Sequence, residues 1–278
     1  MIRINLHLHS TSSDGVFSPA ELVRMLRKNK VSIASLTDHD TTEGVRSFLD
    51  SCRRHSLRGV AGVELSSLHQ GEELHILGYR FDLDHPELND LLTACRNARC
   101  ERNKAMCERL TSLGFPVSLE EVEARVPVGV AGRPHIAQVM REKGFVPTEQ
   151  EAFLRWLRRG RPAFVPRVLL PAESCIEVLR RAGGLPVWAH PLTSLSDPSE
   201  LEPTLDRLKE AGLWGLECWF PGATSAVTYR CLVEAGKRGL YQTAGTDFHG
   251  RAGRGERISG CVVEDDLLPW AWFCGGRG

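Results

Sequence analysis

Short apolar segments, most of them followed at once by a histidine or a carboxylate, alternate along this chain with helical patterns. The segments expected to be strands are residues 2–6, 33–37, 57–65, 73–79, 185–189, 215–219 and 241–245. Helical patterns are expected over residues 18–29, 42–54, 199–211 and 223–238. Alternation of this kind favours an α/β fold built on a parallel barrel or an open sheet.

Two local signals fix element boundaries. Ser18, Pro19 and Glu21 form a typical helix start, in which Ser18 caps the helix and Glu21 completes a capping box. Gln70-Gly71 is a turn signal between two strand patterns. The sequence therefore predicts that the strands on either side of Gly71 pair as a hairpin.

Residues 95–167 interrupt the strand and helix alternation. This stretch looks helical and contains 14 Lys and Arg against 8 Asp and Glu, although the whole chain is neutral. We interpret it as an inserted helical cap, with residues 1–94 and 168–278 forming the α/β domain. A basic cap favours a phosphate-bearing substrate, while a solvated helix surface is the alternative for any single arginine.

The composition bounds the class of protein. The chain has 278 residues, 42% of them hydrophobic, which is enough for one large α/β core or a core with a small second domain. It contains neither an apolar run long enough for a membrane span nor a signal-peptide pattern, so we expect a cytoplasmic protein.

The nine cysteines of the chain include no Cys-x-x-Cys pair and suit reduced thiols. A net charge of zero disfavours extensive binding of duplex DNA.

Candidate metal ligands begin at the first strand. The alternation over residues 2–8 puts His7 and His9 on one face of a strand end, where both imidazoles can reach one metal ion. Taken alone, the pair could equally be hydrogen-bonded core histidines, and Asp14 before Gly15 could be a turn former. His39 follows an apolar run, at the position where active-site loops begin in parallel α/β folds. Asp38 could orient an imidazole, and Asp40 could cap the next helix.

The same pattern recurs along the rest of the chain. Glu64 ends an apolar strand, where a carboxylate is costly to bury unless it is paired or coordinated. His75 alternates with apolar residues and could be a core histidine, while His190 follows another apolar strand. Asp247 and His249 lie two residues apart at the last strand end. Recurrence at successive strand ends favours a metal centre over unrelated core residues.

These motifs resemble those of the PHP (polymerase and histidinol phosphatase) family of metal-dependent phosphoesterases. The resemblance implies a distorted (βα)7 barrel of the PHP type that holds two or three divalent ions. It implies one ion held by His7, His9, Glu64 and Asp247, with Glu64 bridging to a second ion held by His75 and His190. It further implies a third ion held by Asp14, His39 and His249. Some members carry histidine where this chain has Asp14.

Within the family, the chain looks most like a branch with a helical insertion that acts on nucleotides. This branch includes 3′,5′-nucleoside bisphosphate phosphatases and 5′-to-3′ exoribonucleases. By that resemblance Arg133 and His135 would contact substrate phosphate, and Arg99 and Arg102 are further candidates that could instead be helix-surface charges. The resemblance implies a nucleotide or a short RNA as the substrate. Histidinol phosphate remains an alternative.

A metal centre of this kind would activate water for attack on phosphorus, with His190 or Asp247 assisting proton transfer. The carboxylate and imidazole donors permit Mn, with Fe or Zn as alternatives. A hydrolase of amide or lactone bonds could also carry His-x-His at its first strand, and a noncatalytic accessory module is a further alternative. The sequence leaves the oligomeric state open.

Overall fold

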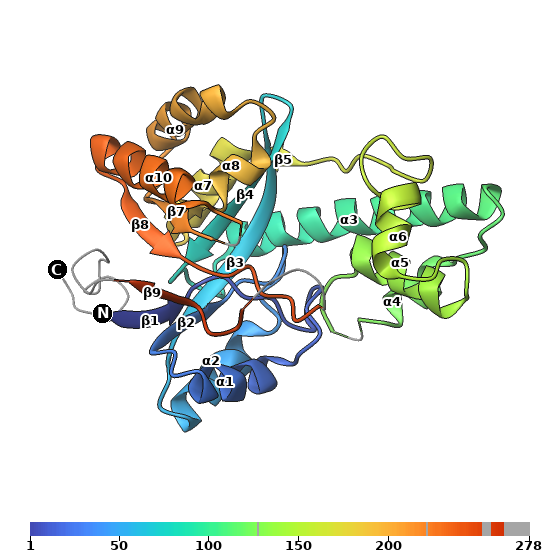
Figure 1. Cartoon of the computed structure of the whole chain (residues 1–278), viewed down its shortest axis with the longest axis horizontal. Helices are drawn as coiled ribbons and strands as arrows, with labels where there is room; N and C mark the ends of the chain where they lie inside the picture. The colour runs from blue at the N-terminus through green and yellow to red at the C-terminus, as the bar shows by residue number, and fades with distance from the viewer. Residues whose placement is uncertain (127, 221, 252–256, 264–278) are drawn as a thin grey trace.

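The computed structural model describes residues 1–126, 128–220, 222–251 and 257–263. The part of the expected barrel domain at 264–278 therefore lies outside the described residues. Within the described part, strands and helices alternate over most of the chain (Figure 1). The expected α/β class is confirmed.

Seven strands form a barrel-shaped sheet that is nearly closed. β1 (Ile2–Asn5), β2 (Ile33–Leu36) and β3 (Arg58–His69) run parallel to one another. β4 (Glu72–Tyr79) is antiparallel to β3 and to β6 (Leu185–Trp188), which β7 (Gly215–Trp219) and β8 (Tyr241–Ala244) follow in parallel. The amide of Leu6 donates to Ala244 O at 3.1 Å, and that of His9 to Phe248 O at 2.9 Å, which joins the first barrel strand to the last. The antiparallel β4 is what distorts the barrel.

The expected hairpin and helix start are both confirmed. Gln70 (φ 49°) and Gly71 (φ 87°) make the turn between β3 and β4, which pair from Gly62 with Tyr79 to His69 with Glu72. At α1 (Pro19–Lys28), the Glu21 carboxylate accepts from Ser18 N at 2.8 Å while the Ser18 side chain accepts from Glu21 N. Local sequence signals therefore determine both features.

Helices cover the outside of the barrel on two sides (Figure 1). α1 and α2 (Val45–Arg54) lie on one side, and α7 (Ala172–Arg181), α9 (Leu201–Glu210) and α10 (Ser225–Arg238) lie on the other. The short α8 (Pro191–Ser194) and η2 (Pro198–Glu200) follow β6. The barrel interior is filled by buried side chains that include Ile4, Leu6, Leu77, Tyr79, Val187 and Ala244. The barrel is thus a packed core, and the site must lie at its end.

Four of the described elements were not expected from the sequence. These are the helices α7 and α8, the two-residue β5 (Leu170–Pro171) parallel to β3, and β9 (Cys261–Val263) antiparallel to β1. The two strands are too short to show a periodic pattern, since their pairing depends on contacts with distant parts of the chain. β5 carries the chain back from the insert to the barrel.

The insert, residues 95–167, projects from one side of the barrel (Figure 1). It contains most of α3 (Pro86–Ser112), followed by α4 (Leu119–Glu123), α5 (Arg133–Glu142), α6 (Glu149–Ala152) and the π-helix η1 (Phe153–Leu157). A hydrophobic cluster of its own runs from Met106 to Ala163 in sequence. This separate core supports an inserted subdomain, which stays a prediction because α3 runs unbroken across residue 95.

No helix in the described part of the chain is both long and apolar enough to cross a membrane.

Candidate metal centre and substrate cavity

The loops and strands at one end of the barrel bring all nine expected metal ligands together. They come from the loops after β1 and β2, from β3 and β4, and from the loops after β6 and β8. The ligands are His7, His9, Asp14, His39, Glu64, His75, His190, Asp247 and His249. Successive strands end at the same edge of a barrel, so ligands far apart in sequence meet there.

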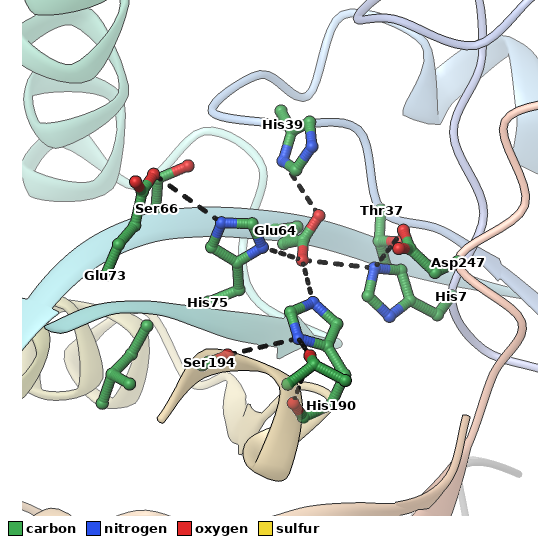
Figure 2. A network of polar contacts seen from close by, with 12 residues as sticks. His7, Thr37, His39, Glu64, Ser66, Glu73, His75, His190, Ser194 and Asp247 are labelled. Carbon is green, nitrogen blue, oxygen red and sulfur yellow. Dashed lines mark hydrogen bonds and ion pairs between the residues drawn. The ribbon is translucent and has the colours of Figure 1, made fainter. Parts of the chain in front are cut away.

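The Glu64 carboxylate lies at the centre of this set, with imidazoles around it (Figure 2). Glu64 is fully buried, and its Oε2 lies 3.2 Å from His9 Nε2 and 2.9 Å from His39 Nδ1. Its Oε1 lies 2.7 Å from His75 Nδ1, and 3.3 Å from the Nε2 atoms of both His7 and His190. Each oxygen therefore faces a different group of imidazoles, an arrangement compatible with the bridging role that the resemblance implies.

The ligand atoms form three overlapping groups, each with its members within 4.8 Å of one another. The groups are His7, His9, Glu64 and Asp247; His39, Glu64 and His75; and His9, Asp14, His39 and His249. The resemblance implied nearly the same division. The structure differs in that His9 joins the group of Asp14, and His39 joins that of Glu64 and His75. His190, expected with Glu64 and His75, is in none of the three groups, although its Nε2 lies 3.3 Å from Glu64 Oε1.

Buried polar atoms in this cluster fit a bound cation. His7 Nε2, His9 Nε2, Asp14 Oδ1, His39 Nδ1 and Glu64 Oε2 are buried and make no hydrogen bond within the described residues. Leaving such atoms unsatisfied is costly, and coordination removes that cost. Imidazole and carboxylate donors suit Mn, Fe or Zn. The residues present therefore fit the divalent ions that the sequence predicts.

Neighbouring charges in the cluster offset the effect of burial on the pKa values of its ionisable groups. Burial disfavours the charge on Glu64, but His39, His75 and His7 hold the pKa of this carboxyl well below its usual range. Burial also disfavours protonation of His9, yet the nearby carboxylates of Asp247 and Glu64 raise the pKa of this imidazole to about 10. The carboxylates thus stay ionised, as metal ligands must.

Residues next to the ligands hold them in place. The buried Glu217 accepts from His7 Nδ1 at 3.2 Å and from the backbone amide of His190 at 2.9 Å. The first contact leaves His7 Nε2 directed at the cluster, with Nδ1 carrying the proton. Asp38 accepts from Ser13 Oγ at 2.6 Å, and that hydroxyl lies 3.5 Å from His9 Nδ1. Asp38 therefore reaches an imidazole through a serine.

Three site residues other than glycine have a left-handed backbone. These are Asp40 (φ 54°), His190 (φ 30°) and Asp247 (φ 47°). Such conformations cost free energy and persist where the surrounding structure fixes them, which is common at active sites. At Gly245, any Cβ would collide with the His7 side chain, so only glycine lets β8 approach β1 this closely.

A cavity of about 200 Å³ opens over the metal ligands. Its lining includes five of the expected ligands, Asp14, His39, His75, Asp247 and His249, together with Arg99, Arg102, Arg133 and Arg167. Three of these four arginines were expected from the sequence, and Arg167 was missed. An isolated arginine in a loop leaves no periodic or motif signal, so sequence reasoning had nothing to identify it by.

Asp40 organises two of these arginines and does not cap a helix. The N-cap of α2 is Gly44, whereas the fully buried Asp40 accepts from Arg99, and from Arg167 Nη1 at 2.8 Å. The expected helix-capping role of Asp40 is therefore wrong. Asp40 pairs with the positively charged Arg99, which lies 59 residues further along the chain. A local sequence pattern cannot reveal a contact over that separation.

His135 lies away from the cavity lining. Its Nδ1 accepts from the backbone amide of Gly132 at 3.0 Å and so caps the start of α5. Burial lowers the pKa of this imidazole to about 4, so the ring is neutral. The expected contact of His135 with phosphate gains no support from this position, whereas Arg133, two residues earlier, lines the cavity.

Glu217 was missed although it carries the same signal as Glu64. It stands inside the apolar strand Gly-Leu-Glu-Cys-Trp, where a carboxylate is costly unless paired. Applied consistently, the argument that identified Glu64 would have identified Glu217 as well.

The comparisons with known proteins agree on one kind of protein. A family model described as the PHP domain matches residues 5–115. A 5′-3′ exoribonuclease of Haemophilus influenzae is 30% identical over 272 residues, which cover 98% of this chain and 99% of the relative. A 3′,5′-nucleoside bisphosphate phosphatase of Chromobacterium violaceum is 28% identical over 270 residues, covering 97% and 94%. A solved structure described as a metal-dependent phosphoesterase, from Bifidobacterium adolescentis, matches with a TM-score of 0.86 at 29% identity, covering 95% of this chain and 93% of that one.

Proposed function

The chain belongs to the PHP family of metal-dependent phosphoesterases, and we propose that it hydrolyses phosphate esters of nucleotides, either 3′,5′-nucleoside bisphosphates or 5′-phosphorylated short RNA. The observation that carries this proposal is a cavity lined both by candidate metal ligands and by four arginines. Metal ions and guanidinium groups both attract phosphate oxygens, so this lining suits a substrate with more than one phosphate group. The names of the two relatives, an exoribonuclease and a bisphosphate phosphatase, support the same substrate class.

The four arginines that line the cavity carry more positive charge than the carboxylates paired with them can balance. Asp40 pairs with Arg99 and Arg167, and Glu73 lies 3.4 Å from Arg167. Arg102 donates from Nε to the neutral Asn103 and makes no ion pair with a described residue. Burial, reinforced by repulsion from Arg99 and Arg133, lowers the pKa of Arg102 well below its usual range. An anionic group on the substrate would relieve this repulsion.

The nine clustered side chains are proposed as the ligands of two or three divalent ions, with Mn as the first candidate. When bound, these ions would lower the pKa of a water molecule and neutralise charge on the phosphoryl group. Glu64 would bridge two of them through its two oxygens. Arg99, Arg102, Arg133 and Arg167 would bind the phosphate oxygens that face away from the ligands.

Proton transfer is proposed for Asp247 or His190. Their role would be to assist proton transfer to the leaving alcohol. Asp247 lines the cavity, and a third of its side chain is exposed. His190 is not among the lining residues, and its Nδ1 lies 3.0 Å from Thr193 Oγ1. These positions favour Asp247 as the group that a substrate can reach.

The test is product release by Mn-loaded protein from three substrates: 3′-phosphoadenosine 5′-phosphate, 5′-phosphorylated RNA of a few nucleotides, and histidinol phosphate. We expect turnover of a nucleotide substrate that is lost in a His7→Ala/His9→Ala variant, because two ligands of one group are removed. Turnover of histidinol phosphate alone would contradict the nucleotide assignment. No product release from any of the three substrates would contradict the proposed activity as a whole.

A further inference from the structure

An exposed basic surface lies beside the cavity on the insert. The arginine segment, residues 153–164, reads Phe-Leu-Arg-Trp-Leu-Arg-Arg-Gly-Arg-Pro-Ala-Phe and contains four arginines and no acidic residue. It comprises η1 and the loop that leads towards β5, on the yellow-green stretch after α6 in Figure 1. Arg155, Arg158, Arg159 and Arg161 are all exposed. Four like charges held this close together repel one another and attract an anionic partner.

Both ends of the arginine segment lie at the cavity. Phe153 lines the cavity directly. At the other end, the Phe164 ring lies under the Arg133 guanidinium, with 5.9 Å from Cζ to the ring centroid, and Arg133 lines the cavity as well. Backbone hydrogen bonds from Ala163 N to Trp156 O and from Arg161 N to Arg158 O fold the segment back on itself. The arginines therefore lie in a short folded segment that begins at the cavity and ends against a residue that lines it.

Three of the five other exposed cations of the insert form ion pairs with described residues, namely Arg125, Arg141 and Lys143, whereas Lys104 and Arg109 form none. In the arginine segment only one of four does. Arg125 contacts Glu142 at 2.5 Å, and Lys143 contacts Glu121 at 2.7 Å. In the arginine segment, Arg155 lies 3.4 Å from Glu151, whereas Arg158, Arg159 and Arg161 have no ion pair with any other residue that the structure describes. A solvated face without a partner would be expected to mix both signs, as the rest of the insert does.

We infer that the arginine segment binds the phosphodiester backbone of a single-stranded RNA whose end occupies the cavity. Single-stranded nucleic acids are bound by positively charged surfaces that follow the backbone without reading the sequence. A mononucleotide bisphosphate is contained in the cavity and does not need this surface. The inference rests on the proposed function, and within it the segment favours RNA as the larger of the two proposed substrates.

The test compares two triple variants that remove the same charge. The first is Arg158→Gln/Arg159→Gln/Arg161→Gln in the segment. The control is Arg24→Gln/Arg27→Gln/Arg54→Gln, which removes three exposed arginines from α1 and α2 on the barrel. Each protein is assayed for kcat/KM on 3′-phosphoadenosine 5′-phosphate and on a 5′-phosphorylated RNA of eight nucleotides. Binding of a 3′-labelled RNA of the same length is measured by fluorescence anisotropy from 50 to 200 mM salt.

For the segment variant we expect kcat/KM on the RNA to fall by roughly ten-fold at low salt, with the small bisphosphate affected by less than about two-fold. The slope of log affinity against log salt should become shallower by about 2, since each lost phosphate contact removes about 0.7 on single strands. Equal effects on both substrates, or equal effects of the control variant, would overturn the inference. If the wild-type protein turns over neither substrate, the proposed function fails, and the anisotropy comparison still decides whether the segment binds RNA.

Discussion

At the scale of single residues, Glu217 shows how a side chain that is no metal ligand can control the centre. Its two oxygens accept from His7 Nδ1 and from His190 N, so it holds two of the expected ligands from different barrel strands. In Glu217→Gln only one amide oxygen can accept, and the NH₂ group meets a second donor. We expect a 10- to 100-fold loss of affinity for the metal, a typical cost of removing such a partner. Calorimetric titration with Zn²⁺ or Mn²⁺ measures it.

The matched control is Glu234→Gln on α10, a buried carboxylate that pairs with Lys237 and Arg238 outside the metal cluster. It should leave metal affinity unchanged. Equal affinity losses in both variants would mean that the effect of Glu217 is one of general stability.

At the scale of elements, Asp40 joins the loop after β2 to α3 and to the end of the insert. It accepts from Arg99 on α3 and from Arg167, and it is fully buried. In Asp40→Asn the buried guanidinium of Arg99 loses its anionic partner and that of Arg167 keeps only Glu73, which we expect to lower the free energy of unfolding by roughly 3–5 kcal/mol. Urea denaturation measures it. Asp84→Asn breaks the exposed pair with Arg46 and should change stability little, so a large loss there, or none in Asp40→Asn, would refute this role.

The helices and strands also show how much of the fold could be predicted from the sequence. The seven barrel strands follow from apolar runs, and the β3–β4 hairpin follows from Gln70-Gly71, because these signals are local. β5 and β9 were missed, since strands of two and three residues depend on their partners. The ligand set was predictable because strand ends converge in a barrel. Arg167 was not, since its role depends on an aspartate 127 residues away.

At the scale of the whole molecule, the metal cluster ties together loops from both halves of the chain. His7 and Glu64 lie in the first quarter of the sequence, and Asp247 and His249 near its end. Ions that bind only the folded state stabilise it by about 2.7 kcal/mol at a hundred times Kd. We expect Mn²⁺ to raise the Tm of chelator-treated protein by roughly 5–10 °C. The His7→Ala/His9→Ala variant should show a smaller rise, and an equal rise would place the stabilising ions elsewhere.

The central claim is that Glu64 bridges ions in a centre that hydrolyses phosphate esters. The most direct measurement is kcat for 3′-phosphoadenosine 5′-phosphate in Glu64→Ala, together with the number of Mn ions bound per chain. The account predicts a loss of roughly a thousand-fold or more in kcat and fewer bound ions, because every imidazole now directed at Glu64 loses its common partner. Turnover and metal content equal to those of the wild-type protein would contradict it.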